Sequence, residues 1–416
     1  TVFWTQMFLC FIAYFVLFFV SPWIAIFYER EEIMFMTRIA GISILISGVR
    51  NIQLSYVSKN LQFKKFFFAT LVGTVTSSII GVVLAYKGAG AWALIIQHLA
   101  NLFIDTCVLW IIVKWHPHFL FSFKRLKTLF AFGINVFFTS LLDTVYNDIR
   151  SLVIGKLYSP TELGCYNRGK AFPNLIVSNI STSISSVLFP VMSKSQDNIK
   201  TVRGMTRRSM KMGMFLLSPL MFGLAVISEN LVQILLTEKW IESIPFVRIF
   251  CVALIFSPVN KANLNAIKAL GRGDLLFLLS IARKSTGILF LILTVRHGVK
   301  AIALGYLANA ILAQIINAIP NKNLLAYSYK NQIADIFPYL ILSLFMAVII
   351  FPLHFLSIPK GLILILQILL GAIVYILGVK IFRLEAYTYT KKLLAKAIKI
   401  KKGEIIFVFI DTFIKP

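Results

Sequence analysis

The chain is poor in charged residues and in cysteine. Only 14% of its 416 residues are Asp, Glu, Lys or Arg, whereas 58% are hydrophobic. A soluble protein of this length forms two or three domains whose surfaces need far more charge, so the composition argues against a soluble enzyme and a disordered chain. Its four cysteines form no CxxC pair, which argues against a disulfide scaffold and against thiolate metal ligands.

Sequence motifs of common enzymes are also missing. The chain has no Walker A loop, no GxSxG turn, no HExxH pair and no DxD motif. His116 and His118 flank Pro117 in a basic segment, but the lack of further ligands nearby favours a solvated or headgroup-facing role over a metal site. We therefore expect no enzymatic activity, no ATP hydrolysis and no cofactor or metal.

Acidic residues are scarce. The 16 Asp and Glu residues stand against 42 Lys and Arg, which gives a formal net charge of +26. A nucleic-acid binder would carry such charge on a polar face. Here the basic residues fall between long apolar runs, and the mean hydropathy is +0.84. We therefore expect no nucleic-acid partner, because this layout is typical of a membrane protein.

Long apolar runs predict an all-α polytopic membrane protein with about twelve transmembrane helices. Each run is close to the ~20 residues that span a bilayer. The first run is too long for a signal-peptide core and has no basic stretch before it, so we interpret it as a true span. The predicted spans are 2–27, 33–57, 66–86, 91–113, 129–155, 164–188, 212–236, 245–267, 275–295, 301–320, 333–356 and 361–382.

The loops between these spans differ in charge. Alternate loops, beginning with 59–65 and ending with the tail, hold 26 Lys and Arg residues, and the intervening loops hold 7. Basic loops stay in the cytoplasm, so both ends of this chain are predicted to be cytoplasmic. The apolar run 405–410 in the basic tail is too short to span a membrane. The tail is either an interfacial segment attracted to anionic lipid or a solvated end.

Polar residues recur at helical spacing inside four predicted spans, which places them on one face of each helix. A Pro258 kink is predicted within the span 245–267. The stripes are Ser43, Ser47, Arg50 and Asn51; Asn135, Thr139, Asp143, Asn147 and Arg150; Asn167, Lys170, Asn174, Ser178, Ser181 and Ser185; and Ser257, Lys261, Asn265 and Lys268.

These stripes have two interpretations. Ser, Thr and Asn side chains join membrane helices by hydrogen bonds of about 0.6 kcal/mol each, and small residues such as Gly73, Gly81 and Gly305 are typical of close helix packing. Charged members instead favour a water-filled cationic cavity, because a charge in hydrocarbon costs at least ~2.5–3.5 kcal/mol. Arg and Lys at such a depth suit an anionic group such as phosphate.

Six segments, taken in order, resemble one known family. They are 50–65, 90–94, 148–156, 163–175, 188–197 and 271–274. Together they resemble the Wzx-type polysaccharide flippases, the lipopolysaccharide and exopolysaccharide biosynthesis transporters of the multidrug/oligosaccharidyl-lipid/polysaccharide superfamily. The resemblance extends over nearly the whole chain, to about residue 380.

The resemblance implies a V-shaped, MATE-like bundle of two six-helix lobes and two further helices. In this register the family has two helices before Thr1, so we expect a segment upstream and an incomplete N-terminal lobe of four spans in 1–115. The second lobe is expected in 116–321, the two additional spans in 332–382, and the basic cytoplasmic tail in 383–416.

The resemblance also implies a function. Family members move undecaprenyl-pyrophosphate-linked oligosaccharide, the repeat unit of O-antigen, capsule or exopolysaccharide, across the cell inner membrane by alternating access. The implied partners are this lipid-linked oligosaccharide, membrane lipids, a coupling proton or sodium ion, and a polysaccharide polymerase. Spacing and resemblance together give a predicted substrate-binding set: Arg50, Asp143, Asn147, Asp148, Arg150, Asn167, Arg168, Lys170, Asn174 and Lys261.

Two other functions are compatible with a polytopic membrane protein. A drug/cation antiporter of the same superfamily is disfavoured, because a cationic cavity repels cationic drugs. A membrane-embedded polymerase or glycosyltransferase generally needs a sizeable external loop or a metal-binding carboxylate motif, and the predicted external loops are about ten residues long.

Overall fold

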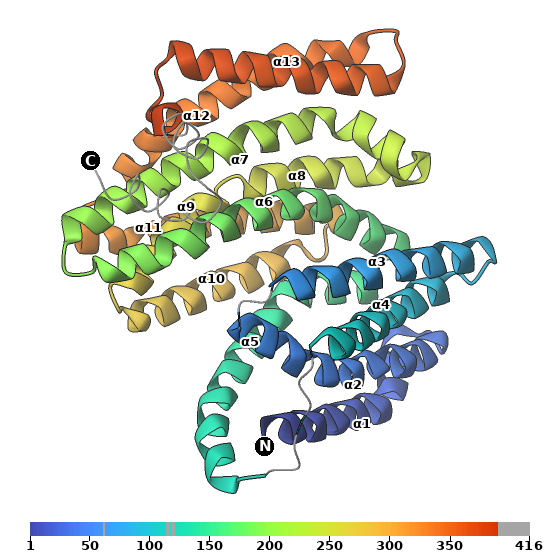
Figure 1. Ribbon diagram of the computed structural model, residues 1–416. Helices are drawn as coiled ribbons and strands as arrows, with labels where there is room; N and C mark the ends of the chain where they lie inside the picture. The colour runs from blue at the N-terminus through green and yellow to red at the C-terminus, as the bar shows by residue number, and fades with distance from the viewer. Residues whose placement is uncertain (61–62, 114–116, 118–120, 390–416) are drawn as a thin grey trace. The chain divides into compact units, whose positions relative to one another are not determined.

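The computed structural model describes residues 1–60, 63–113, 117 and 121–389, and the regular secondary structure in this part is helical (Figure 1). Ten helical segments within it are long and apolar enough to cross a membrane, which confirms the predicted all-α membrane fold. The other two predicted spans coincide with α5 (Phe123–Leu157) and α6 (Pro160–Lys194), each 35 residues long. The predicted interfacial tail lies outside the described residues from 390 onward.

The chain divides into two compact units, Thr1–Asn147 and Asp148–Pro416, with the boundary inside α5. In the first unit α3 packs on α4, α1 packs on α2, and α2 also contacts α4. Close packing at two of the predicted glycines is confirmed, since a Cβ at Gly73 would lie 3.1 Å from the Asp105 Cβ and one at Gly81 would lie 2.8 Å from Gln97. The helices are α1 (Val2–Tyr28), α2 (Glu32–Lys59), α3 (Phe63–Tyr86) and α4 (Ala91–Ile112).

The second unit is built around α7, which contacts α6, α8, α9, α12 and α13 (Figure 1). Its buried face is rich in methionine and leucine, including Met205, Met210, Met214, Leu217 and Met221. After α6 the elements are α7 (Ile199–Leu236), the 3₁₀ segment η1 (Glu238–Ser243), α8 (Ile244–Leu254), α9 (Ser257–Ala269), α10 (Gly273–Thr294), α11 (Val299–Leu325), α12 (Tyr329–Ile350), the 3₁₀ segment η2 (Phe351–Phe355) and α13 (Lys360–Ile381).

The predicted break in the span 245–267 is present, because α8 ends at Leu254 and α9 begins at Ser257. Pro258 lies in the first turn of α9, where its missing N–H costs no helical hydrogen bond. Gly213 of α7 faces this proline, and a Cβ at this position would overlap the Pro258 Cβ. The proline thus sets both the start of α9 and its close approach to α7.

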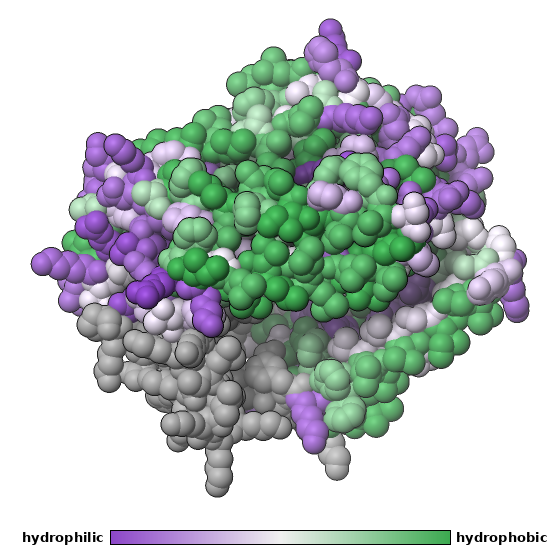
Figure 2. Space-filling model, turned by 90° about the horizontal axis from the view of Figure 1, so that it is seen from above, coloured by the Kyte–Doolittle hydropathy of each residue, from purple (hydrophilic) through white to green (hydrophobic). Residues whose placement is uncertain are grey.

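Large apolar side chains cover much of the outer surface. On the face seen in Figure 2, hydrophobic residues fill the middle and hydrophilic residues gather toward the sides. Phe8 and Trp23 of α1 are 66% and 68% exposed, and α13 exposes a row of leucine and isoleucine side chains. Exposed apolar surface of this extent is expected where lipid tails replace water as the solvent.

We expect Gly213→Ala to lower the thermal unfolding temperature of the detergent-purified protein. The added methyl group has no room against the rigid Pro258 ring, and overpacking of this kind costs about 1–3 kcal/mol. Gly204→Ala is the matched control, because it lies on the same helix and, beyond the backbone of its own helical turns, its added methyl group would have no described atom within 4 Å. Equal unfolding temperatures for the two variants would contradict the tight α7–α9 contact.

Candidate functional site

The last turns of α5 bring Arg150 into the interior of the second unit. Its side chain is buried, with 3% of the residue exposed. Nη2 donates a hydrogen bond of 3.1 Å to the Gly287 carbonyl of α10, and the guanidinium carbon lies 5.1 Å from the centre of the Tyr306 ring of α11. Arg150 thus links three helices.

Lys170 of α6 reaches the same aromatic ring. Its Nζ lies 5.5 Å from the Tyr306 ring centre. We call Arg150, Lys170 and Tyr306 the Tyr306 cluster. Its members carry two positive charges, and a ring face attracts cations through its quadrupole without cancelling their charge. The cluster is therefore suited to attract an anionic group.

Local sequence features place Lys170. Helix α6 begins with Pro160 and a capping box, in which Ser159 and Glu162 bond to each other's backbone N–H. Gly169 then lets α6 approach α8, since a Cβ there would overlap the Phe246 Cβ and lie 3.0 Å from the Val247 nitrogen. This contact holds the turn of α6 that carries Lys170.

The end of α5 is anchored independently of Arg150. The Tyr158 hydroxyl donates to the carbonyl of Val295 and accepts a 3.0 Å hydrogen bond from the Gly298 N–H. Both partners lie in or next to the turn between α10 and α11. The anchor therefore holds α5 against the two helices that the guanidinium also contacts.

A buried hydroxyl lies in the aromatic layer behind the Tyr306 cluster. The Phe250 ring is 5.2 Å from the Tyr166 ring and 5.3 Å from the Tyr306 ring. Tyr166 is 1% exposed, and its hydroxyl has no hydrogen-bond partner among the described residues. A buried hydroxyl without a partner costs about 1–3 kcal/mol, so Tyr166 is an unused donor within the site.

Other predicted binding residues lie around this cluster. Ser151 donates a 3.0 Å hydrogen bond to the Asn167 side chain, which ties α5 to α6 next to Arg150. Arg168 stacks on a different aromatic residue: its guanidinium lies 5.1 Å from the centre of the Trp240 ring. The side chain of Asn174 is exposed on α6.

Three predicted residues of α5 are exposed. Asp143 and Asn147 belong to the first unit, and Asp148 begins the second. Their exposure is compatible with the predicted polar face of α5. The substrate role assigned to them stays a prediction.

Lys261 of α9 is half-buried and has no hydrogen bond or ion pair with another described residue. On α9 the half-buried Asn260 and the buried Asn263 form a polar face. Asn317 donates to the Asn260 side chain at 3.1 Å, and Asn321 donates to the Asn263 side chain at 2.6 Å.

These amide contacts continue to α12, where the Gln332 side chain accepts a 2.9 Å hydrogen bond from Asn263. They join α9, α11 and α12 in the manner of interhelical polar contacts in membranes. The amides of α11 were not predicted from the sequence. The signal that could have found them is the four-residue interval between Asn317 and Asn321, which places both on one face.

Arg50 belongs to the first unit, whereas the Tyr306 cluster belongs to the second. Its Nη2 lies 2.6 Å from Asp105 Oδ2, which joins α2 to α4. Asp105 is only 2% exposed. The pair gives Arg50 a structural role, and its role in substrate binding stays a prediction.

Residues 1–245 match the family described as polysaccharide biosynthesis protein. The match covers more than half of the chain, so the chain belongs to this family. The resemblance to polysaccharide flippases found in the sequence is thereby confirmed.

Three curated relatives are also similar to this chain in sequence. They are the teichuronic acid biosynthesis protein TuaB of Bacillus subtilis, 26% identical over 67% of this chain; the succinoglycan biosynthesis transport protein ExoT of Rhizobium meliloti, 22% identical over 68%; and the lipopolysaccharide biosynthesis protein WzxC of Escherichia coli, 24% identical over 69%. The chain spans 58%, 57% and 59% of their respective lengths.

The fold is also similar to a solved structure, the lipid II flippase MurJ in an inward closed conformation. The TM-score is 0.74 at 17% sequence identity, and the match covers 92% of this chain and 82% of that chain. At this identity the likeness establishes the fold.

We expect Asp105→Ala to destabilise the protein by about 3–5 kcal/mol, because the Arg50 charge loses its partner in the membrane interior. Thermal unfolding in detergent measures the effect. The double variant Arg50→Met with Asp105→Leu should recover most of the loss, since it removes both charges. If Asp105→Ala unfolds at the wild-type temperature, the pair does not hold α2 to α4.

Proposed function

We propose that the chain is part of a flippase for an undecaprenyl-pyrophosphate-linked oligosaccharide, such as an O-antigen, capsule or exopolysaccharide repeat unit. The observation that carries the proposal is the convergence of Arg150 and Lys170 on Tyr306 in a polysaccharide biosynthesis protein. The names of the relatives support a polysaccharide pathway. The likeness to MurJ supports a fold that can flip a lipid-linked saccharide.

The Tyr306 cluster suits the pyrophosphate of such a substrate. A guanidinium can bond two phosphate oxygens at once, while an ammonium acts as a point charge. Tyr166 adds a hydroxyl donor, and the half-buried Lys261 adds a further cation in the same unit. The sugar hydroxyls would bond polar side chains of the second unit on α6, such as Asn167 and Asn174, and the polyprenyl tail would stay in the bilayer.

The mechanism we propose is alternating access in the cytoplasmic membrane, with both ends of this chain in the cytoplasm. A proton or sodium ion is the proposed coupling ion, and a polysaccharide polymerase is the proposed downstream partner. Net positive charge at the Tyr306 cluster disfavours the drug/cation antiporter, since cationic drugs would be repelled.

Arg150→Ala and Lys170→Met, introduced into the full-length gene, should each reduce surface polysaccharide by about 10- to 100-fold. Losing one charged hydrogen bond costs about 1.5–3 kcal/mol, and each 1.4 kcal/mol is tenfold. Lys261→Ala should impair export in the same direction. The measurement is surface polysaccharide together with the leaflet that holds the lipid-linked repeat unit.

Lys322→Ala, an exposed lysine at the end of α11, is the matched control and should export normally. Immunoblots of the membrane fraction establish that each variant is present. Repeat units retained on the cytoplasmic leaflet agree with the proposal. Normal export in the Arg150 and Lys170 variants would mean that these residues serve packing, and unpolymerised units on the outer leaflet would indicate a polymerase.

Tyr306 itself gives a sharper test, because both cations lie over its ring. Tyr306→Phe should retain most export, whereas Tyr306→Leu should lose it by about 5-fold or more, since a cation–π contact in a desolvated site contributes ~1–2 kcal/mol. Quantified surface polysaccharide at equal protein level distinguishes the two variants. Equal export by both would show that the ring does not position the cations.

A further inference from the structure

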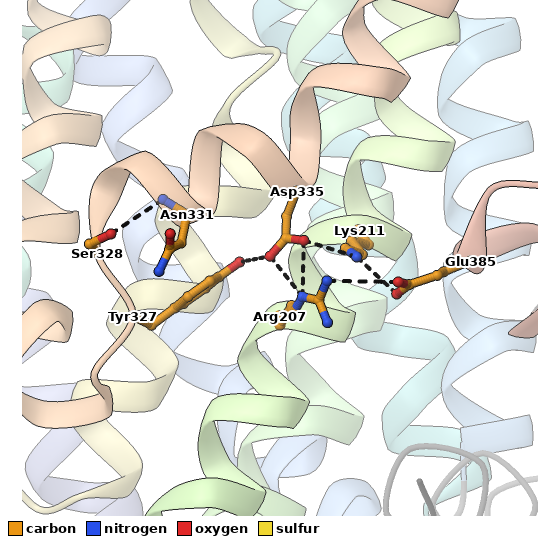
Figure 3. A network of polar contacts seen from close by, with 7 residues as sticks. All are labelled: Arg207, Lys211, Tyr327, Ser328, Asn331, Asp335 and Glu385. Carbon is orange, nitrogen blue, oxygen red and sulfur yellow. Dashed lines mark hydrogen bonds and ion pairs between the residues drawn. The ribbon is translucent and has the colours of Figure 1, made fainter. Parts of the chain in front are cut away.

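A second group of charged residues joins the start of α7 to α12 and to the segment that follows α13 (Figure 3). We call Arg207, Lys211, Tyr327, Asp335 and Glu385 the ion cluster. Asp335 is the inner of its two carboxylates, with 12% of its side chain exposed. Its carboxylate accepts from Arg207 Nε at 2.8 and 2.9 Å, from the Tyr327 hydroxyl at 2.7 Å and from Lys211 Nζ at 3.0 Å.

Glu385 is the outer member of the ion cluster. Its Oε2 lies 2.8 Å from Lys211 Nζ, and its Oε1 lies 3.7 Å from Arg207 Nη2. The Glu385 side chain is 51% exposed, whereas the Lys211 side chain is only 7% exposed. In Figure 3 Glu385 approaches both cations from the side opposite Tyr327. The Glu385 carboxylate therefore covers a lysine that is otherwise enclosed by the protein.

The two carboxylates of the ion cluster differ in how firmly the protein holds them. Asp335 offsets one of the two cations, and four hydrogen bonds or ion contacts hold it in place. Burial and the hydrogen bond to Asp335 raise the pKa of Tyr327, so its hydroxyl remains a donor at neutral pH. Glu385 offsets the second cation through one contact of 2.8 Å and one of 3.7 Å, and half of its side chain is exposed. The outer carboxylate is thus the exchangeable one.

The surroundings of the ion cluster are basic. Lys200, Arg203, Arg207 and Lys211 follow one another at three- and four-residue intervals on α7, which places them along one face. The exposed Arg203 lies 5.8 Å from the Tyr327 ring centre. This end of α7 belongs to a loop region predicted to be cytoplasmic, where anionic lipid headgroups attract basic side chains.

We propose that Arg207 and Lys211 form a phosphate-binding site that the Glu385 carboxylate occupies in this structure, and that a phosphate group displaces this carboxylate. A phosphate offers several strong acceptor oxygens to the guanidinium and the ammonium, so it replaces both contacts of Glu385. The phosphate comes either from an anionic phospholipid headgroup or from solution. The site does not depend on the lipid-linked saccharide or on the Tyr306 cluster.

The test measures thermal unfolding of the detergent-purified chain during titration with phosphatidylglycerol, inorganic phosphate or phosphatidylcholine. Glu385→Gln removes the competing charge while every contact of Asp335 remains. It should lower the half-maximal concentration of the binding phosphate compound by up to about fivefold, the equivalent of a ~1 kcal/mol ion pair. Phosphatidylcholine, whose headgroup has no net charge, should have little effect on any variant.

Arg207→Gln should abolish the stabilisation, and Arg272→Gln is its matched control. Arg272 is exposed, is paired with Asp274 and lies in another loop predicted to be cytoplasmic. The substitution Arg272→Gln therefore removes the same charge at a different place. Gel filtration establishes that the variants are folded, and Lys211→Gln provides a second loss variant. A response to phosphatidylglycerol identifies a lipid site, and a response to inorganic phosphate alone identifies a soluble anion site.

Equal stabilisation of wild type, Glu385→Gln and Arg207→Gln would overturn the proposal, as would no response to either phosphate compound. None of these measurements uses polysaccharide export. A negative result in these titrations would therefore not contradict the proposed flippase function. Normal export in the Arg150 and Lys170 variants would likewise not contradict the phosphate site.

Discussion

A charged side chain inside a bilayer has to find its partners within the protein, because lipid tails offer none. The chain meets this requirement in more than one way. The Arg50–Asp105 pair sets one charge against another. At the predicted cytoplasmic end of α7, the ion cluster likewise sets two cations against two carboxylates. The Tyr306 cluster places two cations against one aromatic face, which carries only partial negative charge. Two positive charges therefore lie close together there, with the acidic Asp148 near Lys170.

The positions of the helices follow from the sequence because the bilayer demands long apolar runs. Each predicted span coincides with a helix, or with the α8–α9 pair where Pro258 interrupts the helix. Close packing was also predictable at Gly305, where a Cβ would lie 2.9 Å from the Thr294 hydroxyl. These features depend on local sequence alone, so hydropathy, proline and small residues are sufficient signals for them.

The site was only partly predictable, since its geometry depends on long-range contacts. Helical spacing placed Arg150 and Lys170 on polar faces, but their meeting point, Tyr306, is one aromatic residue among many in apolar helices. Arg150 and its carbonyl partner Gly287 are 137 residues apart in the chain. On α9, spacing favoured the stripe that contains Lys261, whereas the buried amides lie on a neighbouring face. Helical spacing within one segment does not predict which of two polar faces packs against another helix.

The two cationic clusters of the second unit also differ in what their cations contact. In the ion cluster a carboxylate is already in contact with both cations, so an incoming anion has to displace it. In the Tyr306 cluster the group that both cations contact is the neutral ring of Tyr306 on α11. A transporter needs binding that is favourable on entry and weak enough for release on the other side. In the function proposed above, cations held against an aromatic face would satisfy both conditions, because the ring stabilises them when no ligand is bound.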